Sequence, residues 1–287
     1  MQAPYLADDA FLNDVRAART QSPHALHIWW LGQSGFLLDW QGKYLLFDPY
    51  LSDSLTKKYA ATDKPHLRMT GRVIDPARLD FVDVVTSSHN HTDHLDADTL
   101  KPLLAANPRL VLLAPEANRA FAAERLGIAA AEIVGMDDGV SHTVAGFRIT
   151  GVPAAHEALE YDDAGHHRFL GYLVNVGPWT IYHSGDTLFY PGMPARLRPW
   201  AVDVALLPIN GRAPERRVAG NLSGQEAAKL AYEIQARTLI PCHYDMFAFN
   251  TATPDELIVT CESLGQPYAV LRNGERWSGS VGRERLT

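Results

Sequence analysis

Cysteine is scarce in this chain, since Cys242 and Cys261 are the only two among 287 residues. Two thiols are too few for the disulfide framework of a secreted protein. No C-x-x-C pair indicates a redox site or a zinc knuckle. We therefore expect both thiols to be reduced.

Long hydrophobic runs are absent as well. No stretch reaches the ~18 apolar residues that a membrane-spanning helix needs. Residues 1–14 lack the basic start and apolar run of a secretory signal. The sequence therefore predicts a soluble, cytoplasmic protein with no membrane partner.

Positive charge is in deficit, with 26 Lys and Arg residues against 33 Asp and Glu residues and a net charge of −7. No Lys/Arg-rich arm offers the basic surface that nucleic-acid binding requires. We expect a small-molecule partner and no nucleic acid.

Internal repeats, low-complexity tracts and flexible linkers are also lacking, so we expect one domain over residues 1–287. Helical patterns cover residues 8–20, 100–106, 117–126 and 223–235. Ser223, followed three residues later by Glu226, predicts a capping box for the last of these helices. Short strand-like runs fall into two sets, first 27–31, 35–40, 44–47, 81–86 and 110–113, and then 146–152, 170–176, 179–182, 202–206 and 239–240. Periodicity alone supports a mixed α/β fold.

Four metal-binding side chains lie within six residues, in the run His89-Asn90-His91-Thr92-Asp93-His94. This run directly follows the strand-like residues 81–86. Alternate residues leaving a strand point the same way, so His89 and His91 can offer their imidazoles to one ion. Asp93 and His94 then turn elsewhere and can serve a second ion. Imidazole and carboxylate suit zinc, manganese or iron, so the run predicts a metal site rather than a loop of solvated histidines.

Three later segments each present one further candidate ligand just after an apolar, strand-like run. These candidates are His156, Asp186 and His243. A single His or Asp after a strand is weak evidence, because polar residues at strand ends often serve the structure alone. Their shared position makes them candidates to complete a centre with two metal ions.

Together these residues resemble the motif of the metallo-β-lactamase superfamily, which is H-x-H-x-D-H followed by a distant His, Asp and His. The resemblance implies an α/β fold of four layers, the αββα sandwich. It also implies two metal sites, one held by His89, His91 and His156, the other by Asp93, His94 and His243, with Asp186 as the bridge. The oxygen-reducing relatives resemble H-x-E-x-D at the place of His91, so the resemblance favours hydrolysis.

A narrower likeness covers almost the whole chain. The strings WLGQSGF at 30–36, FDPYLSDS at 47–54, YHSGDT at 182–187, LPINGR at 207–212, GNLS at 220–223 and IPCHYDMF at 240–247 are similar to L-ascorbate-6-phosphate lactonases. This likeness implies manganese, whereas the superfamily at large implies zinc. It also implies a homo-oligomer.

Two neighbouring ions can hold a bridging water, make hydroxide available near neutral pH and polarise the carbonyl that it attacks. We expect Asp186 to orient this nucleophile and Asp93 to handle a proton as the leaving group departs. The predicted reaction is the opening of a lactone such as L-ascorbate 6-phosphate or a related sugar-acid phosphate lactone.

Four residues are candidates for substrate contacts. The guanidinium of Arg212 presents a planar fork of donors that suits phosphate oxygens, and Asn210 stands beside it in a predicted turn. Tyr244 follows the candidate ligand His243, and Asn250 lies shortly after it. We expect all four to line the pocket.

Two other functions remain open from the sequence. The same metal pair suits phosphodiester hydrolysis, and Ser88-His89-Asn90-His91 also resembles the phospholipase D-type branch that acts on N-acyl ethanolamine phospholipids. The other alternative is a non-enzymatic metal-binding scaffold. A structural metal site usually closes at four ligands, whereas a catalytic site keeps one position open.

Overall fold

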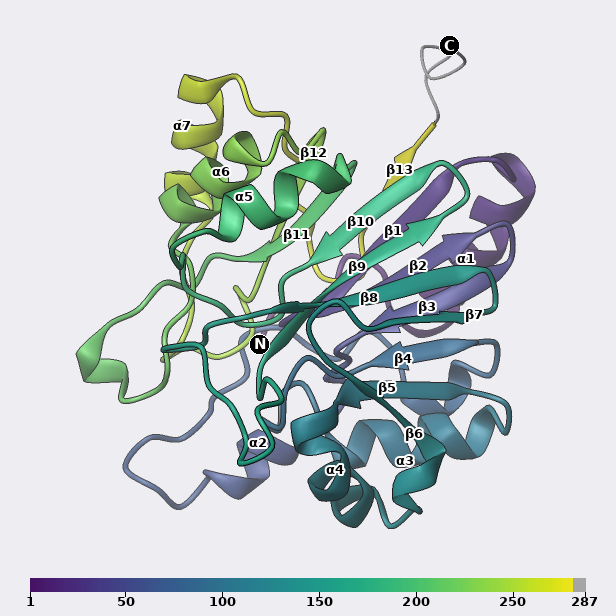
Figure 1. Ribbon diagram of the computed structural model, residues 1–287. Coiled ribbons are helices and arrows are strands. Elements are labelled where there is room, and N and C mark those ends of the chain that lie inside the picture. The colour runs from purple at the N-terminus through teal and green to yellow at the C-terminus, as the bar shows by residue number, and fades with distance from the viewer. Residues whose placement is uncertain (281–287) are drawn as a thin grey trace.

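Two β-sheets form the centre of the computed structural model, which describes residues 1–280 (Figure 1). The seven-stranded sheet has the order β13-β1-β2-β3-β4-β5-β6. Its strands are β1 (Leu26–Gly32), β2 (Gly35–Trp40), β3 (Lys43–Phe47), β4 (Val84–Thr86), β5 (Val111–Pro115), β6 (Ile133–Met136) and β13 (Arg276–Gly279). The hairpins of β1, β2 and β3 are antiparallel, and β3 to β6 run parallel.

The six-stranded sheet has the order β12-β11-β10-β9-β8-β7. Its strands are β7 (Ser141–Val144), β8 (Phe147–Pro153), β9 (Leu170–Val176), β10 (Trp179–His183), β11 (Val204–Pro208) and β12 (Thr238–Cys242). β8 and β10 both pair antiparallel with β9, while β10, β11 and β12 are parallel. The carboxyl ends of β8, β10 and β12 therefore meet at one edge of this sheet.

Helices flank the two sheets (Figure 1). They are α1 (Asp8–Gln21), α2 (Ser54–Lys58), α3 (Ala97–Ala106), α4 (Arg119–Leu126), α5 (Met193–Leu197), α6 (Gly224–Glu233) and α7 (Asp255–Leu264). Helices α1, α3 and α4 share a hydrophobic cluster with the seven-stranded sheet, while α5, α6 and α7 share one with the six-stranded sheet. This arrangement confirms the expected α/β fold of four layers.

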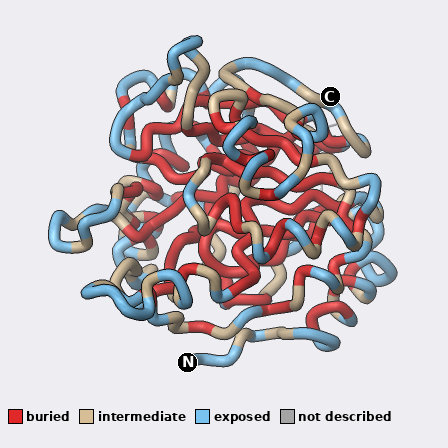
Figure 2. The backbone as a smooth tube through the Cα atoms, turned by 90° about the horizontal axis from the view of Figure 1, so that it is seen from below, coloured by how far each residue is buried: buried red, intermediate tan, exposed pale blue. Residues whose placement is uncertain are grey.

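The alternation of side chains along β1 shows how one strand serves two layers. Trp29 packs with Phe11 of α1 in the outer cluster, whereas Ile28 and Trp30 belong to the cluster that also contains Leu173 of the other sheet. Side chains alternate between the faces of a strand, so a strand covered on both faces is apolar throughout. Figure 2 shows the result, with buried segments through the middle of the molecule and exposed segments around them.

Most elements agree with the pattern in the sequence. β2 and β9 have the expected bounds, and the capping box of α6 is confirmed, because Ser223 Oγ accepts from Glu226 N while Glu226 accepts from Ser223 N. β4 is shorter than expected, since residues 81–83 precede the strand and Asp83 instead accepts a hydrogen bond from Tyr44 N. The sequence pattern did not predict β6, β7, β13, α2, α5 or α7. The end of the expected domain, residues 281–287, lies outside the described residues.

None of the helices within residues 1–280 is long and apolar enough to cross a membrane.

Candidate metal centre

The seven candidate ligands lie on loops at the carboxyl ends of four strands. The loop after β4 carries His89, His91, Asp93 and His94; His156 follows β8, Asp186 follows β10, and His243 follows β12. The first four thus come from the seven-stranded sheet and the last three from the six-stranded sheet. Parallel strands direct the loops after them to one edge, and the packing of the two sheets brings both sets of loops together.

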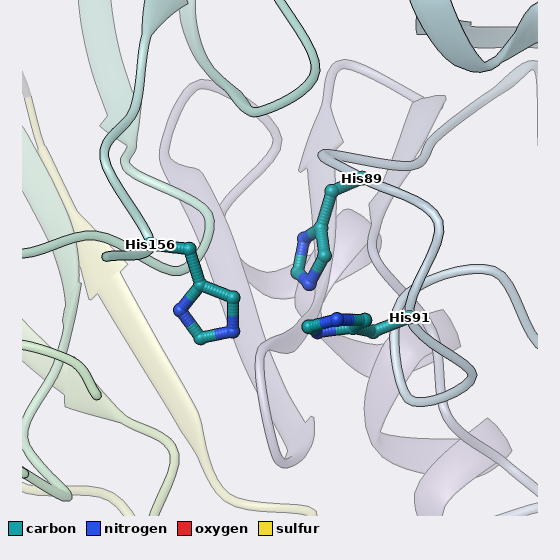
Figure 3. A group of neighbouring side chains, drawn as sticks. All are labelled: His89, His91 and His156. Carbon is teal, nitrogen blue, oxygen red and sulfur yellow. The ribbon is translucent and has the colours of Figure 1, made fainter. Parts of the chain in front are cut away.

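Three histidines form the first group. One ligand atom from each of His89, His91 and His156 lies within 4.8 Å of the others. Their ring centroids are 4.6 to 5.2 Å apart, and the three rings point toward a common centre (Figure 3). Three imidazoles grouped in this way could hold one metal ion.

Asp93, His94 and His243 form the second group, with ligand atoms again within 4.8 Å of one another. Asp186 lies between the groups. Its Oδ2 is 3.3 Å from Nε2 of both His94 and His243, and 3.6 Å from Nε2 of His156. His89, His94 and Asp186 also form a group with ligand atoms within 4.8 Å of one another, so the two groups share one cluster. The structure thus brings the seven candidate residues together, and the division into two ligand sets is the one that the family resemblance implies.

Hydrogen bonds on the far side of three rings fix their orientation. His94 Nδ1 lies 2.7 Å from Asp48 Oδ2, His156 Nδ1 lies 3.0 Å from the carbonyl oxygen of Gly220, and His89 Nδ1 lies 3.0 Å from Ser88 Oγ. A carboxylate and a carbonyl can only accept, so Nδ1 of His94 and of His156 carries the proton. The lone pair of a neutral ring is then on Nε2, which faces the cluster.

The inward nitrogens fit a metal ion. His89 Nε2 is buried and finds no hydrogen-bond partner within residues 1–280. A buried polar atom without a partner is costly unless something else binds it. Imidazole nitrogens together with carboxylate oxygens form a donor set for zinc, manganese or iron.

The electrostatics of the cluster favour a cation. Burial would raise the pKa of Asp186, but His94 and His243 hold that pKa well below its usual value, so the carboxylate stays ionised. Burial and the neighbouring His94 lower the pKa of His89 well below its usual value, which keeps its ring neutral. Burial would lower the pKa of His94 too, but Asp186 and Asp93 raise it well above its usual value. A metal ion would replace that proton on His94.

Two further side chains, Asp48 and Gln33, support the cluster and were not predicted in this role. Asp48 accepts from His94 and also from Thr86 Oγ1 and Ser88 N. Gln33 Nε2 donates to Asp93 Oδ2 over 2.7 Å and lies 3.0 Å from His243 Nε2. Both residues have positive φ, as does His243, and such backbone strain gathers at functional sites. Gln33 was marked only by its place in a string that resembles a family, and the position of Asp48 directly after the strand-like residues 44–47 indicated a substrate contact rather than a partner of His94.

The cluster opens into a cavity of about 580 Å³. His91, Asp93, His156, Asp186 and His243 line it beside Gln33. Other parts of the wall are aromatic, and Tyr59 stacks there on His66 with ring centroids 4.0 Å apart. The cavity has room for a small molecule next to the candidate ligands.

Of the four expected substrate contacts, only Asn250 lines this cavity. Asn210 lies behind it and donates from Nδ2 to Asn250 Oδ1. Tyr244 is buried against Trp30, and its hydroxyl donates to the carbonyl of Leu271. The structure therefore does not bring Asn210 or Tyr244 into the cavity.

Arg212 does not line this cavity either, contrary to the expectation from the sequence. It lines a separate cavity of about 310 Å³, and its guanidinium makes two hydrogen bonds to the carboxylate of Glu226, of 2.9 and 2.7 Å. That carboxylate already occupies the donor fork that was expected to bind phosphate. Arg212 is thus an ion-pair partner at the start of α6.

Comparison with known proteins gives one family over most of the chain. The family described as the beta-lactamase superfamily domain matches residues 43–244. A UPF0173 metal-dependent hydrolase of Methanosarcina mazei is 28% identical over 236 residues, covering 80% of this chain and 88% of that protein. Another from Opitutus terrae is 30% identical over 255 residues, covering 87% and 98%.

Solved structures share the fold at lower identity. Igni18, described as a metallo hydrolase from Ignicoccus hospitalis, aligns with a TM-score of 0.66 and 21% identity over 90% of this chain and 100% of its own. An isothiocyanate hydrolase from Delia radicum gut bacteria aligns with a TM-score of 0.70 and 20% identity over 89% and 100%.

Proposed function

The chain belongs to the beta-lactamase superfamily and, within it, to the UPF0173 metal-dependent hydrolases, and from this premise we propose that it opens a lactone ring at a centre of two divalent metal ions. His89, His91 and His156 would hold one ion, and Asp93, His94 and His243 the other. The observation that carries the proposal is the position of Asp186, whose Oδ2 lies 3.3 to 3.6 Å from imidazole nitrogens of both sets. One carboxylate can therefore join two metal sites.

Metal ions bound there would lower the pKa of a water molecule toward ~7 and polarise the carbonyl under attack. The protein supplies the rest. The ionised Asp186 accepts a hydrogen bond from the attacking water and orients it. Asp93 lines the cavity, where its side chain is 17% exposed, and Gln33 Nε2 fixes its Oδ2. Asp93 is thus placed to take a proton from the attacking water and to pass it to the departing ring oxygen.

A lactone suits this cavity better than a long polymer. The volume of about 580 Å³ leaves room for a small molecule, and the wall mixes the polar centre with aromatic side chains. L-ascorbate 6-phosphate stays the first lactone to test, with manganese or zinc as the metal. Arg212 no longer serves as its phosphate anchor, because Glu226 occupies that guanidinium.

The test is hydrolysis by metal-free protein reconstituted separately with manganese and with zinc. The substrates are L-ascorbate 6-phosphate, simple γ- and δ-lactones, and bis-p-nitrophenyl phosphate. We expect turnover of a lactone that disappears with chelator and returns with one of the metals. Turnover of the phosphodiester alone would replace the lactone by the phosphodiesterase alternative, and a protein that unfolds on chelation without hydrolysing any substrate would support the scaffold alternative.

A further inference from the structure

Two cationic side chains of Lys or Arg type within residues 1–280 line the cavity, Lys58 and Arg125. Lys58 is exposed at the end of α2. Arg125 is half-buried in the last turn of α4, beside Asn90 and His91 on the cavity wall. Of these two side chains, Arg125 is therefore the one that the surrounding structure holds in position near the metal cluster.

Two backbone contacts fix the guanidinium. Arg125 Nη1 donates to the carbonyl of Asn90 over 2.9 Å and to that of Leu95 over 3.1 Å. Its Cζ lies 4.4 Å from the ring centroid of Phe121. These contacts hold the plane of the guanidinium, and among residues 1–280 they leave Nη2 and Nε for other partners.

Unlike many arginines of this protein, Arg125 has no carboxylate partner within residues 1–280. Arg68 pairs with Asp53, Arg212 with Glu226, and Arg217 with Asp63. The hydrogen bonds of Arg125 go to neutral carbonyls instead. A partly desolvated charge of this kind is stabilised when an anion binds beside it.

Burial also lowers the pKa of Arg125, and the negative charge of Asp96 opposes this effect without cancelling it. The protein thus keeps a guanidinium in a place that disfavours its charge. An arginine fork is suited to two parallel hydrogen bonds with carboxylate or phosphate oxygens.

We propose that Arg125 binds an anionic group of the substrate, so that the enzyme selects small molecules that carry a carboxylate or phosphate in addition to the bond that is cleaved. This inference rests on the proposed function, because only that function makes the bound molecule a substrate. It adds an anionic group as the feature by which the enzyme would discriminate among lactones. Arg125 takes the role that the sequence had given to Arg212.

The test measures binding as well as turnover. The binding probe is pyroglutamate, a five-membered lactam that resists hydrolysis and carries one carboxylate, compared with the neutral pyroglutamide by calorimetry on the metal-loaded protein. Arg125→Met keeps most of the side-chain volume and removes the charge, and Arg125→Lys keeps the charge without the fork. Arg212→Met is the matched control, because that arginine lies outside the cavity.

We expect wild-type protein to prefer pyroglutamate, and Arg125→Met to weaken its binding at least about tenfold while changing pyroglutamide less than about twofold. Arg125→Lys should fall between, and Arg212→Met should match wild type. The same comparison can be made with hydrolysable lactones. Arg125→Met should raise the KM for 5-oxotetrahydrofuran-2-carboxylate at least about tenfold and change the KM for its neutral carboxamide less than about twofold. A second binding measurement uses glycerol 3-phosphate. Tighter binding of pyroglutamate would indicate a carboxylate as the preferred anionic group, and tighter binding of glycerol 3-phosphate would indicate a phosphate.

Arg125 also contacts the loop that carries His91 and Asp93. The test must therefore distinguish binding of the anion by Arg125 from a purely structural role in holding this loop. Loss of that role would lower the metal content and weaken both members of each pair equally, and this outcome overturns the proposal. Equal binding of anionic and neutral probes by wild type overturns it too. If the anionic preference depends on Arg125 while no lactone is hydrolysed, the inference stands and the proposed reaction fails.

Discussion

Asp48 Oδ2 lies 2.7 Å from His94 Nδ1, and both side chains are completely buried. The carboxylate also accepts from Ser88 N, one residue before His89. A buried carboxylate that accepts from Nδ1 turns Nε2 of the ring toward the metal cluster and makes it a stronger ligand. Asp48 therefore orients the candidate ligand His94, which lies 46 positions away in the sequence.

Asp48→Asn should weaken metal binding by about 10- to 100-fold, because the amide cannot supply the negative charge that fixes His94. Competition with a chromogenic chelator measures the affinity. Asp39→Asn is the control, since Asp39 is a buried carboxylate that accepts from Gly42 N in the hairpin between β2 and β3. Equal losses of metal affinity in both variants would argue against a specific role of Asp48.

His91→Ala and Asp186→Asn should each reduce hydrolysis by more than about 100-fold, because the loss of a ligand exceeds the effect of losing its supporting partner. Steady-state kinetics measures this effect, and circular dichroism should show an intact fold. His24→Ala, at an exposed position, serves as the control. Turnover at the wild-type rate in either variant would contradict the two-metal centre.

Gly185→Ala should destabilise the protein by about 2 kcal/mol or more. Gly185 has a φ of +59°, and an added Cβ would lie 2.6 Å from Ser88 Cβ and 2.7 Å from the carbonyl oxygen of Leu170. Gly127 also has a positive φ, of +72°, but an added Cβ there meets nothing within 4 Å. Gly127→Ala should therefore cost only about 1 kcal/mol.

Urea unfolding of both glycine variants separates the two contributions. The difference between them reports the close approach of the loop before Asp186 to the loop before His89. Equal costs would mean that backbone strain alone explains the glycine at 185.

His27 should make the protein less stable in acid. Its ring contacts Ser278 Oγ at 2.8 Å and the carbonyl of Ser22 at 3.1 Å, and burial lowers its pKa below the usual 6.5. Below that pH the unfolded chain binds a proton more readily than the folded protein does. The stability that the neutral ring provides is thus complete above pH 6.5 and is lost as pH falls through the lowered pKa, by at most about 1.4 kcal/mol per pH unit.

Unfolding free energies of wild type and His27→Gln at pH 7.5 and 5.5 measure this effect. The advantage of wild type should shrink at the lower pH, while the titration of other groups cancels in the difference. A constant difference between the two proteins would show that His27 does not contribute to the pH dependence.

The candidate ligands were predictable because their signal is local. His89 and His91 follow a recognisable strand within a few residues, and metal chemistry restricts the types of side chain. Arg212 was assigned to phosphate binding because its ion-pair partner was not recognised. The sequence indicated Glu226 only as a residue of the capping box, whereas its carboxylate also accepts hydrogen bonds from Arg212. β13 escaped notice because Arg276–Gly279 lacks alternation, and it becomes a strand only by pairing with β1, some 250 residues earlier.

The ligands divide between the two sheets, four after β4 and three after β8, β10 and β12. An ion held by both sets is a removable cross-link, and the two sheets cannot separate while it stays bound. Since the unfolded chain offers no such geometry, saturating metal at about 1,000 times its dissociation constant would stabilise the fold by about 4 kcal/mol. The same ion that serves hydrolysis would therefore also slow unfolding and protect the chain from proteases, even in a variant that can no longer turn over substrate.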